Sequence, residues 1–450
     1  MKKIGQILRN KEIMGRIMFT ILILFVFRIG AQITVPGVKI ESDLQNYLSS
    51  NNALALMNIL GGGTLQTFSI FALGVSPYIT AQIITSLLAT DVLPALTELK
   101  RQGQYGRKKM EMATRYLTLM LGAVQAYGII QTLRSADASY ISFNAGKYEW
   151  LTYIYIIVIM MAGSMLVMWL GDQISVKGIG NGISMIIFAG IVCSLPNQIM
   201  SAFSQWIGTS LGTGHELTGV FQFLLYILAY LLIISFVTFI ELSKRKIPVQ
   251  HSGKGGQVQS MAKASFLPIK VNSAGVIPVI FASSIMMAPS VVTAFISPEN
   301  SNATWLGIFN SSTLFDMGGW KMPWGLLIYI ALIIAFSFFY ANIQINPQEL
   351  AENFQKNGSY IPGIRPGNET ERYVKKVLNR VTCIGALALA FIAALPPILT
   401  MSGVFGNNTS LALGGTGLII IVGVALELNS QIDGLLAGKS FDEVVASGGR

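Results

Sequence analysis

The chain has 450 residues, of which 52% are apolar and only 12% are charged, with a formal net charge of +10. An average soluble domain carries about twice that fraction of charged residues. Long uncharged runs such as 218–240 exclude a globular protein and predict an all-α membrane protein, since about 20 apolar residues cross the hydrocarbon core.

Windowed hydropathy predicts ten transmembrane helices. In chain order they cover about 14–34, 64–90, 115–134, 150–170, 181–200, 218–240, 273–295, 324–345, 381–400 and 411–430. The first span follows basic residues without a clear cleavage site, so we interpret it as an uncleaved span. The fifth is the weakest, because Gly182, Gly190 and Pro196 interrupt it.

The basic residues support this count. An even number of spans places both termini on one side of the membrane, and we expect that side to be cytoplasmic. With this orientation, 26 of the 31 Lys and Arg residues fall in cytoplasmic segments, as the positive-inside rule requires. The positive charge therefore follows from membrane topology and does not by itself indicate nucleic-acid binding.

Ten spans divide into two halves of five, which we expect at residues 1–200 and 201–450. An odd number of spans per half inverts one half relative to the other, as in pseudo-symmetric inverted-repeat proteins. The basic cytoplasmic loops 241–272 and 346–380 are long enough to be docking surfaces for soluble partners. Their charges are also explained if they only determine topology.

The second predicted span contains a break. Three glycines, Gly61–Gly63, precede a stretch from Leu65 to Leu73 that is too short to cross the membrane as a helix. Gly74 favours a helix end, and Ser76-Pro77 is typical of the cap and first residue of a new helix. The pattern predicts a short re-entrant helix, capped by Thr64, and then a second helix; a single Pro-kinked span is the alternative.

Two further features carry both a structural and a functional interpretation. The dense glycines of Gly178–Ser184 suit a tight turn entering the membrane, with Asn181 as the helix cap, and close packing alone explains them. Arg28 lies inside the first span, where a charge is a functional candidate by default. It is also close enough to the outer end for its side chain to reach the interface.

No catalytic or metal-binding pattern is found. His215 and His251 fall in loops on opposite sides of the membrane, and no span brings two carboxylates together at helical spacing. The segment 252–257 lacks the spacing of a phosphate-binding loop. We therefore expect no enzymatic activity, no cofactor and no metal. A secondary transporter for a small solute remains compatible with ten spans and a broken helix.

Five stretches resemble the SecY family, the channel subunit of the bacterial protein translocase. In chain order they are FRIGAQITVPG (27–37), SIFALGVSPYITAQII (69–84), GIGNGISMIIFAGI (178–191), LPIKVNSAGVIPVIFASSI (267–285) and IPGIRPGNET (361–370). The resemblance implies a protein-conducting channel with an hourglass pore within one subunit. It also implies that segment 64–73 is a plug, whose body includes Thr64, Leu65, Phe68, Ile70 and Leu73.

The resemblance further implies a pore ring and a lateral gate. The ring of aliphatic side chains corresponds to Val75, Ile79, Ile187, Ile280 and Ile420, with Ile419 and Ile421 as rivals for the last position. The gate lies between the second and third spans and the seventh and eighth, with polar groups from Gln82, Ser283 and Ser284. Hydrogen bonds there could hold the gate shut.

The resemblance also implies partners and location. We expect SecE and SecG subunits, the SecA motor, the ribosome with its RNA, signal peptides and unfolded secretory chains, all at the bilayer of the bacterial cytoplasmic membrane. The residues expected to bind the motor or ribosome are Arg245, Lys246, Lys254, Lys263 and Arg365. The energy for transport would come from the partner.

Overall fold

The structure is a computed structural model that describes most of the chain. The described residues are 10–40, 61–89, 102–135, 141–143, 149–208, 216–251, 265–296, 308–309, 315–316, 321–401 and 415–448, with a few single positions between them. The other residues, including Lys254 and Lys263, lie outside the described part.

Every predicted span contains a helix. The helices are α2 (Lys11–Gly30), α5 (Ser76–Leu88), α7 (Gln104–Ser135), α8 (Glu149–Lys177), α9 (Gly182–Phe203), α10 (Glu216–Leu242), α11 (Ile277–Ile296), α12 (Trp324–Gln344), α14 (Asn368–Met401) and α15 (Gly415–Gly448). Within the described residues, eight helices are long and apolar enough to cross a membrane. Of the other two, α5 has 13 residues, and α11 has 20 residues, of which the stretch Ile277–Met286 was found to be apolar among the described ones.

Helices extend beyond the predicted spans into the predicted loops. The loop 346–380 contains a further helix, α13 (Pro347–Lys356), which Asn346 caps by accepting a hydrogen bond from the Gln348 amide. The same loop contains the first turns of α14, with Glu369 and Glu371 near its start. Hydropathy detects only the apolar part of a helix, whereas the backbone hydrogen bonds continue into water.

The described residues also form three small sheets. Strands β1 (Val38–Ile40) and β2 (Ile141–Phe143) pair in one, and β5 (Phe315–Asp316) and β6 (Lys321–Met322) in another. The largest has the order β4-β3-β7, from β3 (Lys244–His251), β4 (Ser265–Lys270) and β7 (Ser359–Tyr360). Its strands come from the two basic loops, so these loops form one folded unit.

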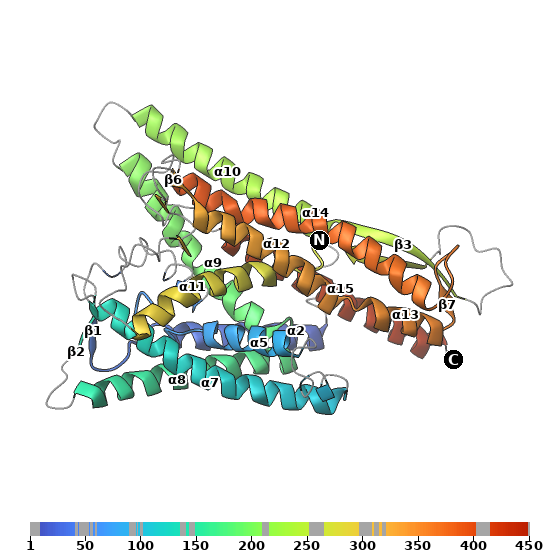
Figure 1. Ribbon diagram of the computed structural model, residues 1–450, viewed down its shortest axis with the longest axis horizontal. Coiled ribbons are helices and arrows are strands. Elements are labelled where there is room, and N and C mark those ends of the chain that lie inside the picture. The colour runs from blue at the N-terminus through green and yellow to red at the C-terminus, as the bar shows by residue number, and fades with distance from the viewer. Residues whose placement is uncertain are drawn as a thin grey trace.

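The helices form two groups (Figure 1). Helices α2, α5, α7 and α8 lie on one side, and α10, α12, α14 and α15 on the other, with α9 and α11 between them. The predicted division at residue 200 falls in the last turn of α9, which continues into the π-helix η1 (Ser204–Gly208).

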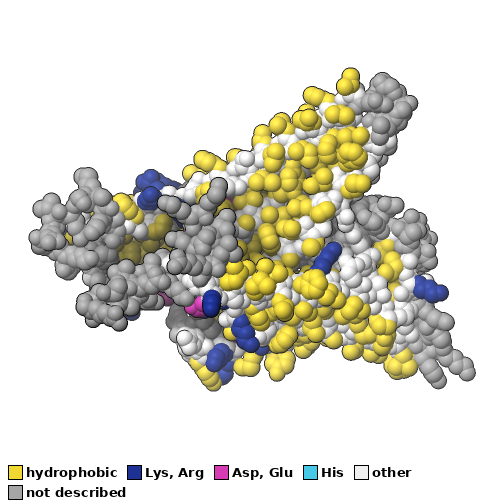
Figure 2. Space-filling view, turned by 180° about the vertical axis from the view of Figure 1, so that it is seen from behind, with side chains coloured by type: hydrophobic (Ala, Val, Ile, Leu, Met, Phe, Trp, Pro, Cys, Tyr) yellow, Lys and Arg dark blue, Asp and Glu magenta, His cyan; other side chains and the backbone are white. Residues whose placement is uncertain are grey.

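Four apolar clusters hold the fold together. The outer cluster lies wholly within residues 35–160 and joins α7 and α8. The C-terminal cluster lies within 202–422 and joins α10, α12, α14 and α15. The central cluster draws on both halves, and a fourth underlies the β4-β3-β7 sheet. Hydrophobic side chains also cover much of the face in Figure 2, as expected for helices that face lipid.

Candidate pore, plug and cytoplasmic docking face

The predicted ring residues come together in the central cluster. Val75, Ile79, Ile187 and Ile420 are buried there, and Ile280 of α11 is partly buried against them. The five residues lie on both sides of the predicted division at residue 200. Four belong to helices α5, α9, α11 and α15, and Val75 is at the cap position of α5. The structure thus brings all five side chains into one apolar group.

The structure separates the rivals for the last ring position. Ile419 is fully buried in the C-terminal cluster, whereas Ile420 is buried in the central cluster. Successive residues of a helix are rotated by about 100°, so neighbours face different clusters. Ile421 is partly buried at the margin of the central cluster. Ile419 therefore lies outside the central cluster that holds the other predicted ring residues.

The break before α5 is confirmed, but the plug segment, residues 64–73, is not helical. Its backbone forms turns from Thr64 onward, with an isolated bridge between Thr34 and Ser69. The predicted helix was wrong because local hydropathy does not register these long-range partners. Phe68 adopts φ +39°, which no helical residue has.

The predicted start of α5 was partly correct. Gly74 has φ +54°, a left-handed conformation that suits glycine at a chain reversal. Helix α5 begins at Ser76 with Pro77 in its first turn, as predicted. Val75 occupies the cap position, however, so Ser76 does not cap the helix. Thr64 also does not cap a helix; its hydroxyl donates to the Gly61 carbonyl.

Backbone hydrogen bonds attach the plug segment to the chain that follows α2. The Val35 amide donates to the Phe68 carbonyl and the Ile70 amide donates to the Ile33 carbonyl, both at 3.0 Å. The Thr67 hydroxyl donates to the Ala31 carbonyl at 3.0 Å. These bonds supply partners at membrane depth, where irregular backbone cannot rely on water.

Asn58 holds the start of the plug segment. Its side-chain oxygen accepts from the Leu65 amide at 3.2 Å and the Gln66 amide at 3.3 Å. Asn58 is buried, so these bonds satisfy polar groups that have no access to solvent. Hydropathy missed Asn58 because a lone polar residue carries no periodic signal.

The plug segment lies between the central and outer clusters. Leu65, Phe68 and Leu73 are buried in the outer cluster. Ile70 packs against both clusters, and Phe71 belongs to the central one, stacked on Phe27 with ring centroids 5.8 Å apart. The segment thus contacts the aliphatic group at one side and the outer core at the other.

Arg28 contacts the glycines that precede the plug segment. Its guanidinium donates to the Gly62 carbonyl at 3.0 Å. Gly62 has φ +77°, and a Cβ added to it would lie 2.7 Å from Gly190 Cα of α9. Arg28 therefore stabilises a turn at a position that only glycine fits. This role is separate from any contact of Arg28 with the membrane interface.

The predicted gate helices are in contact, but the gate serines do not bridge them. Helix α11 packs against α7 and touches α5. The hydroxyls of Ser283 and Ser284 both donate to the Ile280 carbonyl of their own helix, at 2.8 and 2.9 Å. The Gln82 side chain is exposed. The predicted hydrogen bonds across the gate are thus not made by these serines in this conformation.

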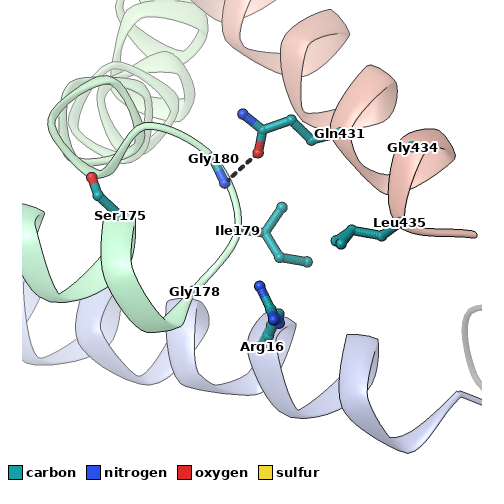
Figure 3. Close-up of a pocket in the computed structure, with 8 residues that line it drawn as sticks. All are labelled: Arg16, Ser175, Gly178, Ile179, Gly180, Gln431, Gly434 and Leu435. Atoms are coloured by element: carbon teal, nitrogen blue, oxygen red, sulfur yellow. Dashed lines mark hydrogen bonds between the residues drawn. The ribbon is translucent and has the colours of Figure 1, made fainter. Parts of the chain in front are cut away.

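The glycine turn before α9 links the two halves. Asn181 caps α9 as predicted, accepting from the amides of Ile183 and Ser184. The Gly180 amide donates to Gln431 Oε1 of α15 at 2.8 Å. A cavity of about 380 Å³ adjoins this turn, and Arg16 of α2 lines it too (Figure 3).

Of the basic residues predicted for partner binding, the three that the structure describes lie in the folded unit formed by the two basic loops. Arg245 and Lys246 are exposed on β3, which pairs with β4 and, at its far end, with β7. Arg365 is exposed in the turn between β7 and α14, where its carbonyl accepts from the Thr370 hydroxyl at 2.9 Å. The alternation of apolar Ile247 and Val249 with exposed residues was a period-two signal for this sheet.

A buried polar contact joins this unit to the helices. The Asn272 side-chain amide donates to the Glu241 carboxylate at the end of α10. The Val271 amide donates to the Ser243 carbonyl at 2.9 Å. These bonds fix the segment between β4 and α11. No group of three potential metal ligands occurs among the residues searched, which are the described ones.

Comparisons with known proteins agree with this architecture. The family model described as SecY matches residues 69–429. The chain is similar to the protein translocase subunit SecY of Lactococcus lactis, with 41% identity over 98% of this chain and 97% of the relative. It is also similar to the SecY subunit of Streptococcus sanguinis, with 42% identity over 96% and 95%.

Two solved structures share the fold. One, described as a protein conducting channel, has a TM-score of 0.65 and 18% identity, covering 94% of this chain and 93% of that one. The other is Sec61 in the canine ribosome-channel complex from the endoplasmic reticulum, with a TM-score of 0.62, 18% identity and the same two coverages. At these identities the likeness concerns the fold alone. From the family model and the full-length relatives, the chain belongs to the SecY family.

Proposed function

We propose that the chain forms a gated protein-conducting channel in the bacterial cytoplasmic membrane. It translocates unfolded secretory polypeptides and releases membrane segments into the bilayer through a lateral gate. The observation that carries this proposal is the convergence of five aliphatic side chains from both halves, directly beside the plug segment. The two halves, residues 1–200 and 201–450, provide the two walls of the pore.

The chemistry of this convergence suits a polypeptide better than a small solute. An aliphatic constriction blocks ions by dewetting, since it cannot replace their hydration shell. Aliphatic side chains are deformable and have no fixed hydrogen-bond partners, so they fit around a chain of any sequence. A secondary transporter instead needs polar or ionisable groups at the membrane midplane.

The plug segment closes the channel at rest. Phe71 and Ile70 lie against the central cluster, and Leu65, Phe68 and Leu73 anchor the segment in the outer cluster. Entry of a signal peptide between α5 and α11 opens the gate, and the polypeptide then displaces the segment. Gln82, which is exposed, and the gate serines, which bond within α11, line this entry.

The cytoplasmic unit receives the partner that supplies energy. Arg245, Lys246 and Arg365 present positive charge on one folded surface, and Lys254 and Lys263 add to it from outside the described residues. Ribosomal RNA is polyanionic, so docking there is salt-dependent. The SecA motor uses the same surface, and SecE and SecG complete the membrane complex. Both termini are cytoplasmic, in keeping with the distribution of Lys and Arg.

Site-specific crosslinking tests the conduit. A photoreactive residue at Ile187 or at Ile280 should crosslink to a stalled secretory chain. Ile419 is the matched control, because it neighbours Ile420 in α15 but is buried in the C-terminal cluster. Absence of crosslinks at both ring positions, or saturable uptake of a small solute by the purified protein, would overturn the proposal.

A charge reversal tests the docking surface. Arg365→Glu should impair SecA-driven export while the protein still inserts at normal levels. Arg365 is exposed and its side chain has no hydrogen bond or ion pair that the structure describes, so folding should be unchanged. Normal export by this variant would contradict the coupling role.

A further inference from the structure

One face of α8 runs alongside the plug segment. Met160, Gly163, Ser164 and Val167 follow the i, i+3, i+4, i+7 pattern of one helix face. Met160 lies in the outer cluster with Phe68. Val167 lies in the central cluster with the ring residues. Helix α8 thus contacts both clusters between which the plug segment lies, with Gly163 and Ser164 in the middle.

Gly163 meets the backbone of the plug segment directly. A Cβ added to Gly163 would lie 1.8 Å from the Ile70 carbonyl oxygen and 2.7 Å from its carbon. These are backbone atoms, which cannot rotate away as a side chain can. Any side chain at position 163 therefore requires the plug segment to move away from α8.

Ser164 holds the end of the same segment. Its hydroxyl donates to the Gly74 carbonyl at 2.9 Å, and both residues are buried. Gly74 has φ +54° at the turn into α5, so this bond fixes the point where the plug segment meets the gate helix. A buried carbonyl without a hydrogen-bond partner is unfavourable, so the Ser164 hydroxyl stabilises this turn.

We propose that Gly163 and Ser164 are positioning residues that set the resting depth of the plug segment over the aliphatic ring. Gly163 allows the segment to lie flat against α8, and Ser164 fixes its end. This inference rests on the proposed function, because it concerns the closed state of that channel. It assigns the closed position to a helix that lies outside the gate and contributes no ring residue.

The contrast with Gly122 separates this role from ordinary helix packing. Gly122 is buried on α7, where an added Cβ would meet Met161 and Pro77 side chains at 3.8 Å, an ordinary contact distance. A methyl group therefore fits at Gly122 but not at Gly163. The two substitutions change a buried helix glycine in the same way and differ in their contact with the plug segment.

The test measures the ion leak of the resting channel, reconstituted in liposomes with its membrane partner subunits. Gly163→Ala should raise the leak severalfold, toward that of a variant lacking residues 64–73. Gly122→Ala should match the wild type. Ser164→Ala should raise the leak by less than Gly163→Ala does. Ser164→Thr, which keeps the hydroxyl, should have the low leak of the wild type.

A second readout follows the plug segment itself. Gln66→Cys, in a chain whose native Cys193 and Cys383 are replaced, should react faster with a membrane-impermeant maleimide when Gly163→Ala is present. Gln66 is partly buried, and its side chain makes no hydrogen bond that the structure describes. A purely structural defect would lower the protein yield without selectively exposing this position.

A double variant that combines Gly163→Ala with the deletion of residues 64–73 tests whether Gly163 affects the ion leak through the plug segment. If Gly163 acts through the plug segment, the double variant leaks no more than the deletion alone. A wild-type leak in Gly163→Ala, or an additive leak in the double variant, overturns the inference and leaves the channel proposal intact. An unchanged leak in the deletion itself overturns the plug assignment. If Gly163→Ala fails to insert into the membrane, the ion leaks of Ser164→Ala and Ser164→Thr test the inference instead: equal leaks in these two variants would overturn it.

Discussion

The plug segment and the β4-β3-β7 sheet satisfy their backbone polar groups in different ways. The sheet forms regular antiparallel ladders although water could satisfy its backbone. The plug segment contains no helix or regular strand, and polar groups of the segment and of Gly74 at its end bond individually to Asn58, Ala31, Ile33 and Ser164. Irregular backbone inside a membrane protein therefore requires partners supplied individually by the surrounding chain.

The two regions also differ in what holds them in place. The sheet depends on a small apolar cluster that includes Ile247, Ile269 and Ile361. The plug segment depends on buried side chains as well, but also on directed hydrogen bonds and on glycines that allow close approach. We therefore expect loss of single polar groups near the plug to have effects that have no counterpart in the sheet.

The largest effect is expected for Ile247→Ala in the sheet. Ile247 is 2% exposed, and the cavity left by such a truncation costs about 2–5 kcal/mol. Backbone amides of β3 and β4 should exchange with deuterium correspondingly faster. Gln250→Ala, an exposed change on the same strand, should leave exchange within about 0.5 kcal/mol of the wild type. Equal exchange in both variants would refute the dependence on volume.

A smaller effect is expected for Arg28→Met at the plug. The variant keeps an apolar side chain of similar length but loses a charged hydrogen bond to Gly62, worth about 1.5–3 kcal/mol. In Arg28→Met the ion leak should rise and Gln66→Cys should be labelled faster. Arg28→Lys, which keeps a charged donor, should give values between those of the wild type and Arg28→Met. A leak unaffected by Arg28→Met would show that the glycine turn holds without this donor.

The smallest change in stability is expected for Arg245→Gln on β3. This exposed substitution should alter thermal stability by less than about 0.5 kcal/mol. It should weaken ribosome binding and lower the steepness of its salt dependence by about one phosphate contact. Ser243→Ala, near the same strand, is a neutral comparison for binding. An unchanged salt dependence in Arg245→Gln would remove this residue from the docking surface.

Much of the helical fold could be predicted from the sequence. Each of the ten spans predicted from hydropathy contains a helix in the described residues, because apolar length is a local property. The cap at Asn181 and the left-handed Gly74 were also local, since each is determined by one residue type in its immediate neighbours. The five ring residues required the family resemblance, because Val and Ile are ordinary residues in any span.

The features that were missed depend on contacts distant in the sequence. The pairing of β3 with β7 joins residues about a hundred positions apart, and no local pattern specifies it. The turns of the plug segment depend on Asn58 and on residues 31–35, so a window over residues 65–73 indicated helix instead. The choice between Ile419 and Ile420 depends on the rotation of α15, which apolar composition cannot define.

The hydrogen bonds described for the plug segment all lead to one half of the molecule. Ala31, Ile33, Val35 and Asn58 bond to the segment itself, and Arg28 and Ser164 bond to Gly62 and Gly74 on either side of it. Residues of the other half share the apolar central cluster with Ile70 and Phe71. Directed bonds keep a fixed geometry, whereas apolar surfaces can slide past one another. If residues 64–73 seal the pore as proposed, a rigid-body separation of the two halves would carry the seal with the first half. Release of the seal would then be a second step, separate from opening of the lateral gate.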